Sequence, residues 1–248
     1  MDDADDRDLE PNDVTTERRP LVVEVMGPAA AGKTSLVRTL CARDDRIQAG
    51  FDVPRIRWFP LVVRRVAHLL PAWLLRYRRD RWFTWNELKS MAFLDVWLRA
   101  AQRQSSTAAV ATLLDHGPVY RLARLREFGP AVTKSERFQR WWHASLDGWL
   151  NTLDIVVSLD APDTVLLRRV EERGHWYLSA DRPEEEKAEF LTRFRRAFAE
   201  TLETGTAAMP RFLHVRSDQR TLDEIADEVS AALGLGARGP RRQETSHR

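Results

Sequence analysis

The residues with the clearest chemical meaning lie near the start of the chain, in Gly27-Pro28-Ala29-Ala30-Ala31-Gly32-Lys33-Thr34-Ser35. This segment follows the pattern G-x-x-x-x-G-K-[ST], in which a lysine and a hydroxyl residue end a loop of small residues. Small residues let several backbone N–H groups approach a polyphosphate, and Lys33 would reach the β and γ phosphates. The Thr34 hydroxyl would complete the shell of a Mg²⁺ ion. The pattern therefore predicts a P-loop that binds a nucleoside triphosphate through residues 27–35.

The segments on either side of this loop support the prediction. A short β-rich apolar run, Leu21–Met26, comes before it, and a segment of helical composition, Leu36–Cys41, comes after it. A strand before and a helix after are the context that the motif requires. The alternative is a glycine turn that carries a lysine and a threonine by chance, which the agreement of motif and context disfavours.

A carboxylate at the end of a second apolar run is the next candidate. The continuous run Ala108–Leu114 is typical of a strand buried on both faces, and Asp115 follows it. Ligands of open α/β sheets bind at the carboxyl ends of the strands. We therefore expect Asp115 to hold Mg²⁺ through water, together with Thr34. The alternative is an aspartate that only starts the turn at Gly117.

Arginines further along the chain are candidates for neutralising phosphate charge. After the apolar run Asp154–Asp160, Arg169 and Arg173 lie four residues apart near the end of a predicted helix. Arg182 follows in a loop before the next helix. This arrangement predicts a mobile lid over about residues 173–186, in which Arg173 and Arg182 act on the phosphates and Arg169 is a reserve nucleotide-binding residue.

Composition limits the class of protein. The chain has 248 residues, of which 43% are hydrophobic and 31% are charged, and this suits one large α/β domain. The net charge of +2 gives no reason to expect a nucleic-acid partner. The single cysteine, Cys41, excludes an intramolecular disulfide and a cysteine-clustered metal site.

Charge and hydropathy divide the chain into a domain with two tails. We expect residues 1–20 to be a disordered acidic tail, 21–235 to be the domain, and 236–248 to be a disordered basic tail. The acidic start lacks the basic and apolar regions of a secretory signal, so we expect a cytoplasmic protein. The most hydrophobic window, Trp58–Leu75, is interrupted by charged residues and should not span a bilayer.

The segment Arg55–Trp82 contains eight arginines and one aspartate among several aromatic residues, and three interpretations stay open. It could form an acceptor pocket with basic groups and aromatic faces. It could be a helical insert whose arginine stems cover apolar surface. It could also attach to an anionic membrane surface, although Pro60 and Pro71 should break the helix into short pieces.

The order of these segments along the chain predicts an α/β fold. Strand and P-loop are followed by a helix, an insert, a strand, helices, a strand, the lid, a helix, a strand and a last helix, Leu222–Leu233. Such alternation indicates a parallel sheet that is covered by helices on both faces.

Together these segments resemble the P-loop kinases of small molecules, most closely the thymidylate kinase and deoxynucleoside kinase branch. The matching stretches are Gly27–Thr34, Asp115-His116-Gly117, Leu159-Asp160-Ala161-Pro162, and Arg173-Gly174 with Asp181-Arg182-x-Glu184. They extend from about residue 21 to 233 and leave about 50–107 largely unmatched. The resemblance implies a P-loop NTPase fold with a five-stranded parallel sheet of order 2-3-1-4-5, an acceptor-side helical insert over about 51–107, and an arginine-bearing lid.

The same resemblance implies an ATP- and Mg²⁺-dependent transfer of the γ-phosphoryl group to a nucleoside or a nucleoside monophosphate. An acidic residue after the second strand often binds or deprotonates the acceptor hydroxyl, and Asp52 is the candidate, although turn chemistry explains it equally well. The branch places an arginine directly after the acidic residue of the third strand, where this chain has His116. The acceptor arginine is therefore missing, or Arg121 or Arg124 supplies it. Related kinases are frequently dimers, which leaves a homodimer open.

Two other functions remain as alternatives. The first is a nucleotide-binding regulatory switch, against which the two lid arginines argue because a switch needs no acceptor closure. The second is a membrane-surface kinase of a lipid or glycan precursor, which only the arginine- and tryptophan-rich segment supports.

Overall fold

The centre of the molecule is a parallel β-sheet. The computed structural model describes residues 19–52, 54–103, 109–172 and 183–235. The five strands are β1 (Leu21–Met26), β2 (Ile47–Ala49), β3 (Ala111–Asp115), β4 (Ile155–Asp160) and β5 (Arg211–Arg216). They lie in the order β2-β3-β1-β4-β5 and all neighbouring pairs are parallel. The fold class and strand order predicted from the sequence are confirmed.

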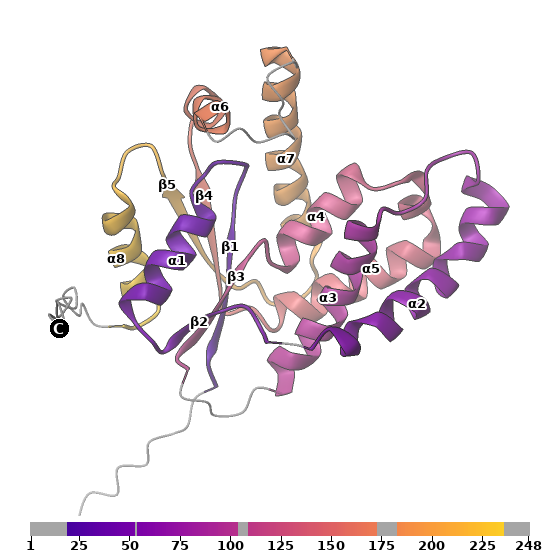
Figure 1. Cartoon of the computed structure of the whole chain (residues 1–248), viewed down its shortest axis with the longest axis horizontal. Helices are drawn as coiled ribbons and strands as arrows, with labels where there is room; N and C mark the ends of the chain where they lie inside the picture. The colour runs from indigo at the N-terminus through magenta and orange to yellow at the C-terminus, as the bar shows by residue number, and fades with distance from the viewer. Residues whose placement is uncertain (1–18, 53, 104–108, 173–182, 236–248) are drawn as a thin grey trace, which may run out of the picture.

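Helices cover both faces of this sheet (Figure 1). On one face lie α1 (Lys33–Arg43) and α8 (Leu222–Ala232). The other face carries α3 (Trp85–Arg103), α4 (Pro118–Phe128), α5 (Glu136–Leu150) and α7 (Glu184–Thr204). Helix α2 (Arg55–Ala72) packs outside α3, and α6 (Asp163–Glu172) follows β4. Two short helical segments, η1 (Trp73–Tyr77) and η2 (Ala131–Lys134), complete the elements.

The side chains of β1 alternate between the two cores. Val23 and Val25 pack in the core that includes α1 and α8, whereas Val22 and Met26 pack in the core of α3, α4 and α5. This alternation follows from the period of two along a strand. It also directs Glu24, which has no exposed surface, toward the α3–α5 side.

Helix α2 is continuous through both of its prolines, so the expectation that Pro60 and Pro71 break it is wrong. A proline removes one backbone N–H donor but fits the helical φ, and packing of one helix face offsets the loss. That face includes the buried side chains Val62 and Leu69. Within the described residues, every helix is too short or too polar to cross a membrane.

Candidate nucleotide site and acceptor side

The P-loop requires glycine at its first position because it passes against β4. Gly27 has φ +144°, and a Cβ atom there would lie 2.1 Å from the Leu159 carbonyl oxygen. Gly32, with φ +100°, precedes α1 and provides no side chain to cap it. An uncapped helix N-terminus attracts anions, so the loop and the first turn of α1 form a site suited to phosphate.

Lys33 lies inside the loop. Its side chain is buried, and its Nζ donates a hydrogen bond of 2.7 Å to the Pro28 carbonyl oxygen. The ammonium group also lies 5.9 Å from the centre of the Tyr120 ring on α4. The lysine is therefore held beside the position that a phosphate would occupy in the loop.

Asp115 and Thr34 meet where β3 ends beside β1. The Thr34 hydroxyl donates to Oδ2 of Asp115 at 2.6 Å, so the two residues predicted to hold Mg²⁺ lie side by side. Nδ1 of His116 lies 3.1 Å from Oδ1, yet that buried oxygen has no aligned hydrogen-bond donor among the described residues. Burial raises the pKa of Asp115, but the His116 ring, the Thr34 hydroxyl and the charge of Lys33 outweigh it and lower the pKa overall. Asp115 is therefore held as a carboxylate.

These donors fit a Mg²⁺ ion that arrives with a nucleotide. Mg²⁺ is usually bound by one or two carboxylates, by phosphate oxygens and by several waters. The Thr34 hydroxyl and the Asp115 carboxylate, which lie side by side, match that requirement. No group of three or more acidic, histidine or cysteine side chains in the described part of the chain could hold a metal by itself.

A cleft of about 280 Å³ opens beside the loop at the ends of β4 and β5. Gly32 and Ser35 line it on one side, and Ser217 and Arg220 line it on the other. Arg169 also lines the cleft, and its guanidinium donates to the Ser217 hydroxyl at 3.1 Å and to the Ser217 carbonyl at 2.8 Å. Sequence reasoning missed Ser217 and Arg220, although both follow a strand at the ligand-binding edge of the sheet.

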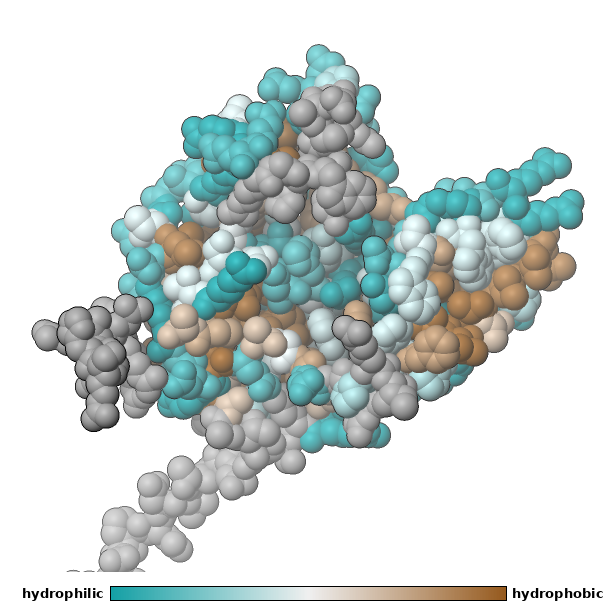
Figure 2. All heavy atoms as spheres, in the orientation of Figure 1, coloured by the Kyte–Doolittle hydropathy of each residue, from teal (hydrophilic) through white to brown (hydrophobic). Residues whose placement is uncertain are grey.

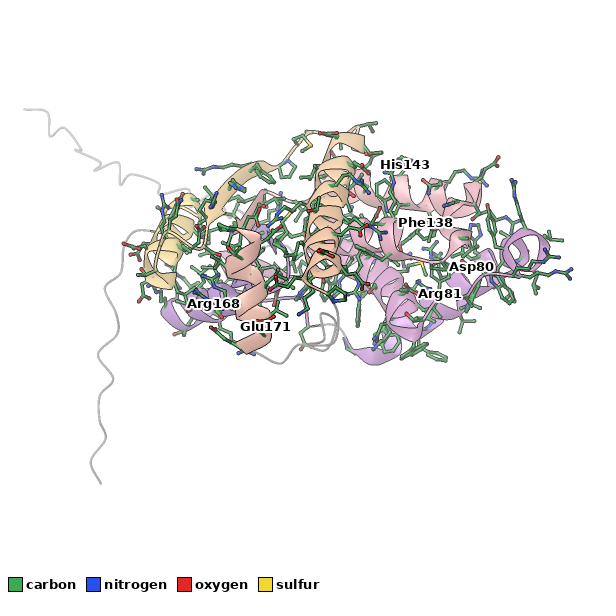
Figure 3. The ribbon with its side chains drawn as sticks, turned by 90° about the horizontal axis from the view of Figure 1, so that it is seen from above. Asp80, Arg81, Phe138, His143, Arg168 and Glu171 are labelled. Carbon is green, nitrogen blue, oxygen red and sulfur yellow. The ribbon has the colours of Figure 1, made fainter. Side chains whose placement is uncertain are left out.

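The predicted lid arginines, Arg173 and Arg182, lie outside the described residues. The helices on either side of them are α6 and α7. The buried ammonium group of Lys187 on α7 donates a hydrogen bond of 3.3 Å to the carboxylate of Glu171 on α6. Glu171 is labelled on α6 in Figure 3. Val170 of α6 packs against Ala30 of the P-loop, so α6 contacts the loop directly.

Asp52 is exposed and follows β2. Because β2 and β3 are parallel, with Ala49 beside Leu113, Asp52 and Asp115 leave the sheet at the same edge. The neighbouring Phe51 ring lies 6.3 Å from the Trp97 ring of α3. Asp52 therefore lies at the same edge of the sheet as Asp115, directly after a residue that belongs to an aromatic cluster.

Of the two arginines that could replace the missing one, Arg121 is the one that reaches this cluster. Its Nη1 donates to the Ser90 hydroxyl at 3.1 Å, and its guanidinium lies 5.6 Å from the Phe93 ring and 5.3 Å from the Trp97 ring. Its Nε is buried without a partner, and burial lowers the pKa of the guanidinium. Arg124, by contrast, is exposed and approaches the Tyr120 hydroxyl at 3.5 Å.

Glu24 is a buried acid that the sequence analysis did not single out. Its two carboxyl oxygens accept hydrogen bonds of 2.8 Å each from the N–H groups of Val119 and Tyr120, in the first turn of α4. Burial raises its pKa to about 7, against the opposing effects of these two bonds and of Arg121. A charged residue within the apolar run of β1 was the available signal. Glu24 thus fixes the start of the helix that carries Arg121.

Comparisons with known proteins give only distant likenesses. No protein-family model and no curated protein matches the sequence. Among solved structures, the YorR protein from Bacillus subtilis, in complex with phosphorylated GDP, matches with 16% identity and a TM-score of 0.47, over 86% of this chain and 96% of that one. Deoxyadenosine kinase from M. mycoides, with dCMP and dCDP bound, matches with 12% identity and a TM-score of 0.45, over 86% and 98%. The strand order of this chain, β2-β3-β1-β4-β5, is the one that the resemblance to the P-loop kinases implies.

Proposed function

We propose that the protein is an ATP-dependent phosphotransferase that acts on a nucleoside or a nucleoside monophosphate. The observation that carries the proposal is the cluster at the end of β1 and β3. There the Thr34 hydroxyl lies 2.6 Å from one carboxylate oxygen of Asp115, Nδ1 of His116 lies 3.1 Å from the other, and Lys33 is buried in the adjacent loop. These groups match the requirements of a magnesium–triphosphate complex.

On the donor side, Lys33 and the loop amides would bind the β and γ phosphates, and the cleft beside Arg169 would take the nucleoside part. Thr34 and Asp115 would hold Mg²⁺, which supplies neutralising charge at the β and γ phosphate oxygens. Arg173 and Arg182 would neutralise the equatorial oxygens during transfer and help to exclude water.

On the acceptor side, Arg121 would hold an anionic or carbonyl group of the acceptor, and Phe93 and Trp97 would present aromatic faces to its base. For a hydroxyl acceptor, Asp52 would take the proton as the acceptor oxygen forms a bond to the γ phosphorus. The bond from that phosphorus to the β–γ bridging oxygen breaks, and ADP leaves with its electron pair. A phosphate acceptor has no such proton and would not need Asp52.

The acceptor assignment is tested by comparing Arg121→Ala with Arg124→Ala, a matched control on the same helix. Loss of a charged hydrogen bond to the acceptor should raise the KM for the acceptor roughly 10- to 100-fold in Arg121→Ala. The KM for ATP should stay unchanged in both variants. Equal acceptor KM values in the two variants, or a rise only in Arg124→Ala, would remove Arg121 from the acceptor site.

A further inference from the structure

Helix α2 and η1 expose a row of large apolar side chains. Phe59, Val63, Leu70 and Leu74 recur at intervals that place them on one helix face, and Leu75 follows. Their exposed fractions are 56%, 53%, 36%, 52% and 87% respectively. We call these five residues the α2 stripe. Because α2 runs unbroken through its prolines and η1 follows it directly, the five residues lie along one helical segment.

The concentration of these residues is the unusual feature. Single exposed apolar side chains are normal on protein surfaces, whereas a contiguous group marks an interaction site. The stripe holds five of the nine large apolar side chains that are exposed in the described part of the chain. Trp85 of α3, also half-exposed, lies nearby with its ring 5.9 Å from that of Trp58. Figure 2 shows apolar atoms gathered over the α2 end of the molecule.

Basic side chains border the stripe. Arg64 is 63% exposed on α2, and Arg140 is 70% exposed on α5. Burial lowers the pKa of His68, and the positive charges of the surrounding arginines, which include Arg64 and Arg140, lower it further. Beyond the stripe, Arg76, Arg78 and Arg79 are exposed. No aspartate or glutamate occurs from residue 55 to 79.

The acidic groups that face this region already have partners. Asp95 accepts from the buried Arg65 at 2.5 Å, with Arg64 at 3.8 Å. Glu136 lies 3.5 Å from Arg140. Asp80 accepts from the backbone N–H of Ala131, and Arg81 binds Glu87. The surface around the stripe is therefore both apolar and positively charged.

This combination selects one kind of partner. A second copy of the chain would bring two acid-free arginine segments together, which like-charge repulsion opposes. A nucleic acid would leave the apolar row uncovered. An anionic bilayer offers phosphate and carboxylate head groups to the arginines, and an apolar boundary to phenylalanine, valine and leucine. We propose that α2 and η1 form a surface that binds reversibly to anionic lipid bilayers and lies in the plane of the head groups.

Co-sedimentation of the full chain with vesicles tests the proposal. The vesicles are pure phosphatidylcholine, or phosphatidylcholine mixed with phosphatidylserine, at low and at high salt. We expect the protein to pellet with the mixed vesicles at low salt, to pellet much less at high salt, and to stay in solution with the neutral ones. Failure to pellet with mixed vesicles at low salt overturns the proposal.

Matched variants distinguish binding through the α2 stripe from non-specific binding of the protein to vesicles. Leu74→Ser should lower the partition coefficient roughly tenfold. The control Met209→Ser changes a residue of almost equal exposure, 53%, before β5, and should leave binding unchanged. The double variant Arg64→Ala with Arg140→Ala should weaken binding roughly fivefold for each arginine. Its control, Arg168→Ala with Arg196→Ala, removes two arginines that are 70% and 60% exposed and lie in similar weak ion pairs.

The control arginine Arg168 lies on α6, on the other side of α7 from the labelled Asp80 and Arg81 in Figure 3. Equal losses in test and control variants would overturn the proposal. Sedimentation velocity tests the other contradicting outcome. In that outcome the wild type does not bind vesicles but forms a dimer, and Leu74→Ser dissociates the dimer. In that case a second copy covers the stripe. All variants should keep the wild-type rate of ADP production without vesicles, which excludes misfolding as the cause.

Discussion

The buried carboxyl of Glu24 predicts that the stability of the protein falls as the pH rises from about 4.5 to about 7. The pKa is 4.5 in the unfolded chain and about 7 in the folded one, where burial penalises the charged form. Within this window the folded state binds a proton that the unfolded state has lost, so the free energy of unfolding decreases with pH. The two pKa values differ by about 2.5 pH units. At about 1.4 kcal/mol per unit, the loss amounts to about 3.5 kcal/mol.

The variant Glu24→Gln isolates this effect because its side chain has nearly the same shape and stays neutral at every pH. Like the protonated acid, the amide offers one good acceptor oxygen to the two N–H groups of Val119 and Tyr120. We therefore expect similar stabilities near pH 4.5, and a loss of about 3.5 kcal/mol by the wild type relative to the variant above pH 7.

Urea unfolding over a series of pH values measures this difference, and other titrating groups cancel because both proteins share them. Glu200→Gln, on the exposed surface of α7, is the matched control and should follow the wild type. A gap between wild type and Glu24→Gln that stays constant with pH would refute the reasoning. A wild type that gains stability with pH relative to the variant would also refute it. That result would show that the N–H groups at the start of α4 lower the pKa of Glu24 by more than burial raises it.

Three further predictions follow from single contacts. Gly27→Ala should abolish ATP binding and lower the melting temperature, because its Cβ would meet the Leu159 carbonyl oxygen at 2.1 Å; unchanged ATP affinity by calorimetry would contradict this. Asp115→Asn should weaken binding of Mg-ATP but leave metal-free ATP binding intact, and a titration with and without Mg²⁺ separates the two. Asp95→Ala should destabilise the protein by roughly 3–5 kcal/mol in urea unfolding, because Arg65, 7% exposed, would keep a buried charge without its partner; a loss below about 1 kcal/mol would contradict the burial of this pair.

The P-loop was predictable from the sequence because its chemistry is local. All of its residues lie within nine consecutive positions, and a strand and a helix on either side position them. Asp115 was predictable for a related reason, since the carboxyl end of any inner parallel strand lies at the ligand edge. The strand order came from the resemblance rather than from periodicity.

The contacts of Arg121 and Glu24 could not be predicted, because they join elements that are distant in the sequence. Arg121 reaches Ser90 and two aromatic rings on α3, and Glu24 of β1 binds the start of α4. The continuity of α2 was missed for a different reason. Proline chemistry is a local signal, whereas the packing of Val62 and Leu69 that outweighs it is tertiary.

The most direct test of the proposed function is ADP production from Mg-ATP across a panel of acceptors, with Lys33→Ala as the blank. The panel holds nucleosides, nucleoside monophosphates, sugars, and polyprenyl or glycan precursors. We expect a nucleoside or a nucleoside monophosphate to raise turnover far above the rate without acceptor, and folded Lys33→Ala to show no transfer. Full transfer by folded Lys33→Ala, or tight ATP binding with no response to any acceptor, would contradict the phosphotransferase; the second result would favour a nucleotide-binding switch.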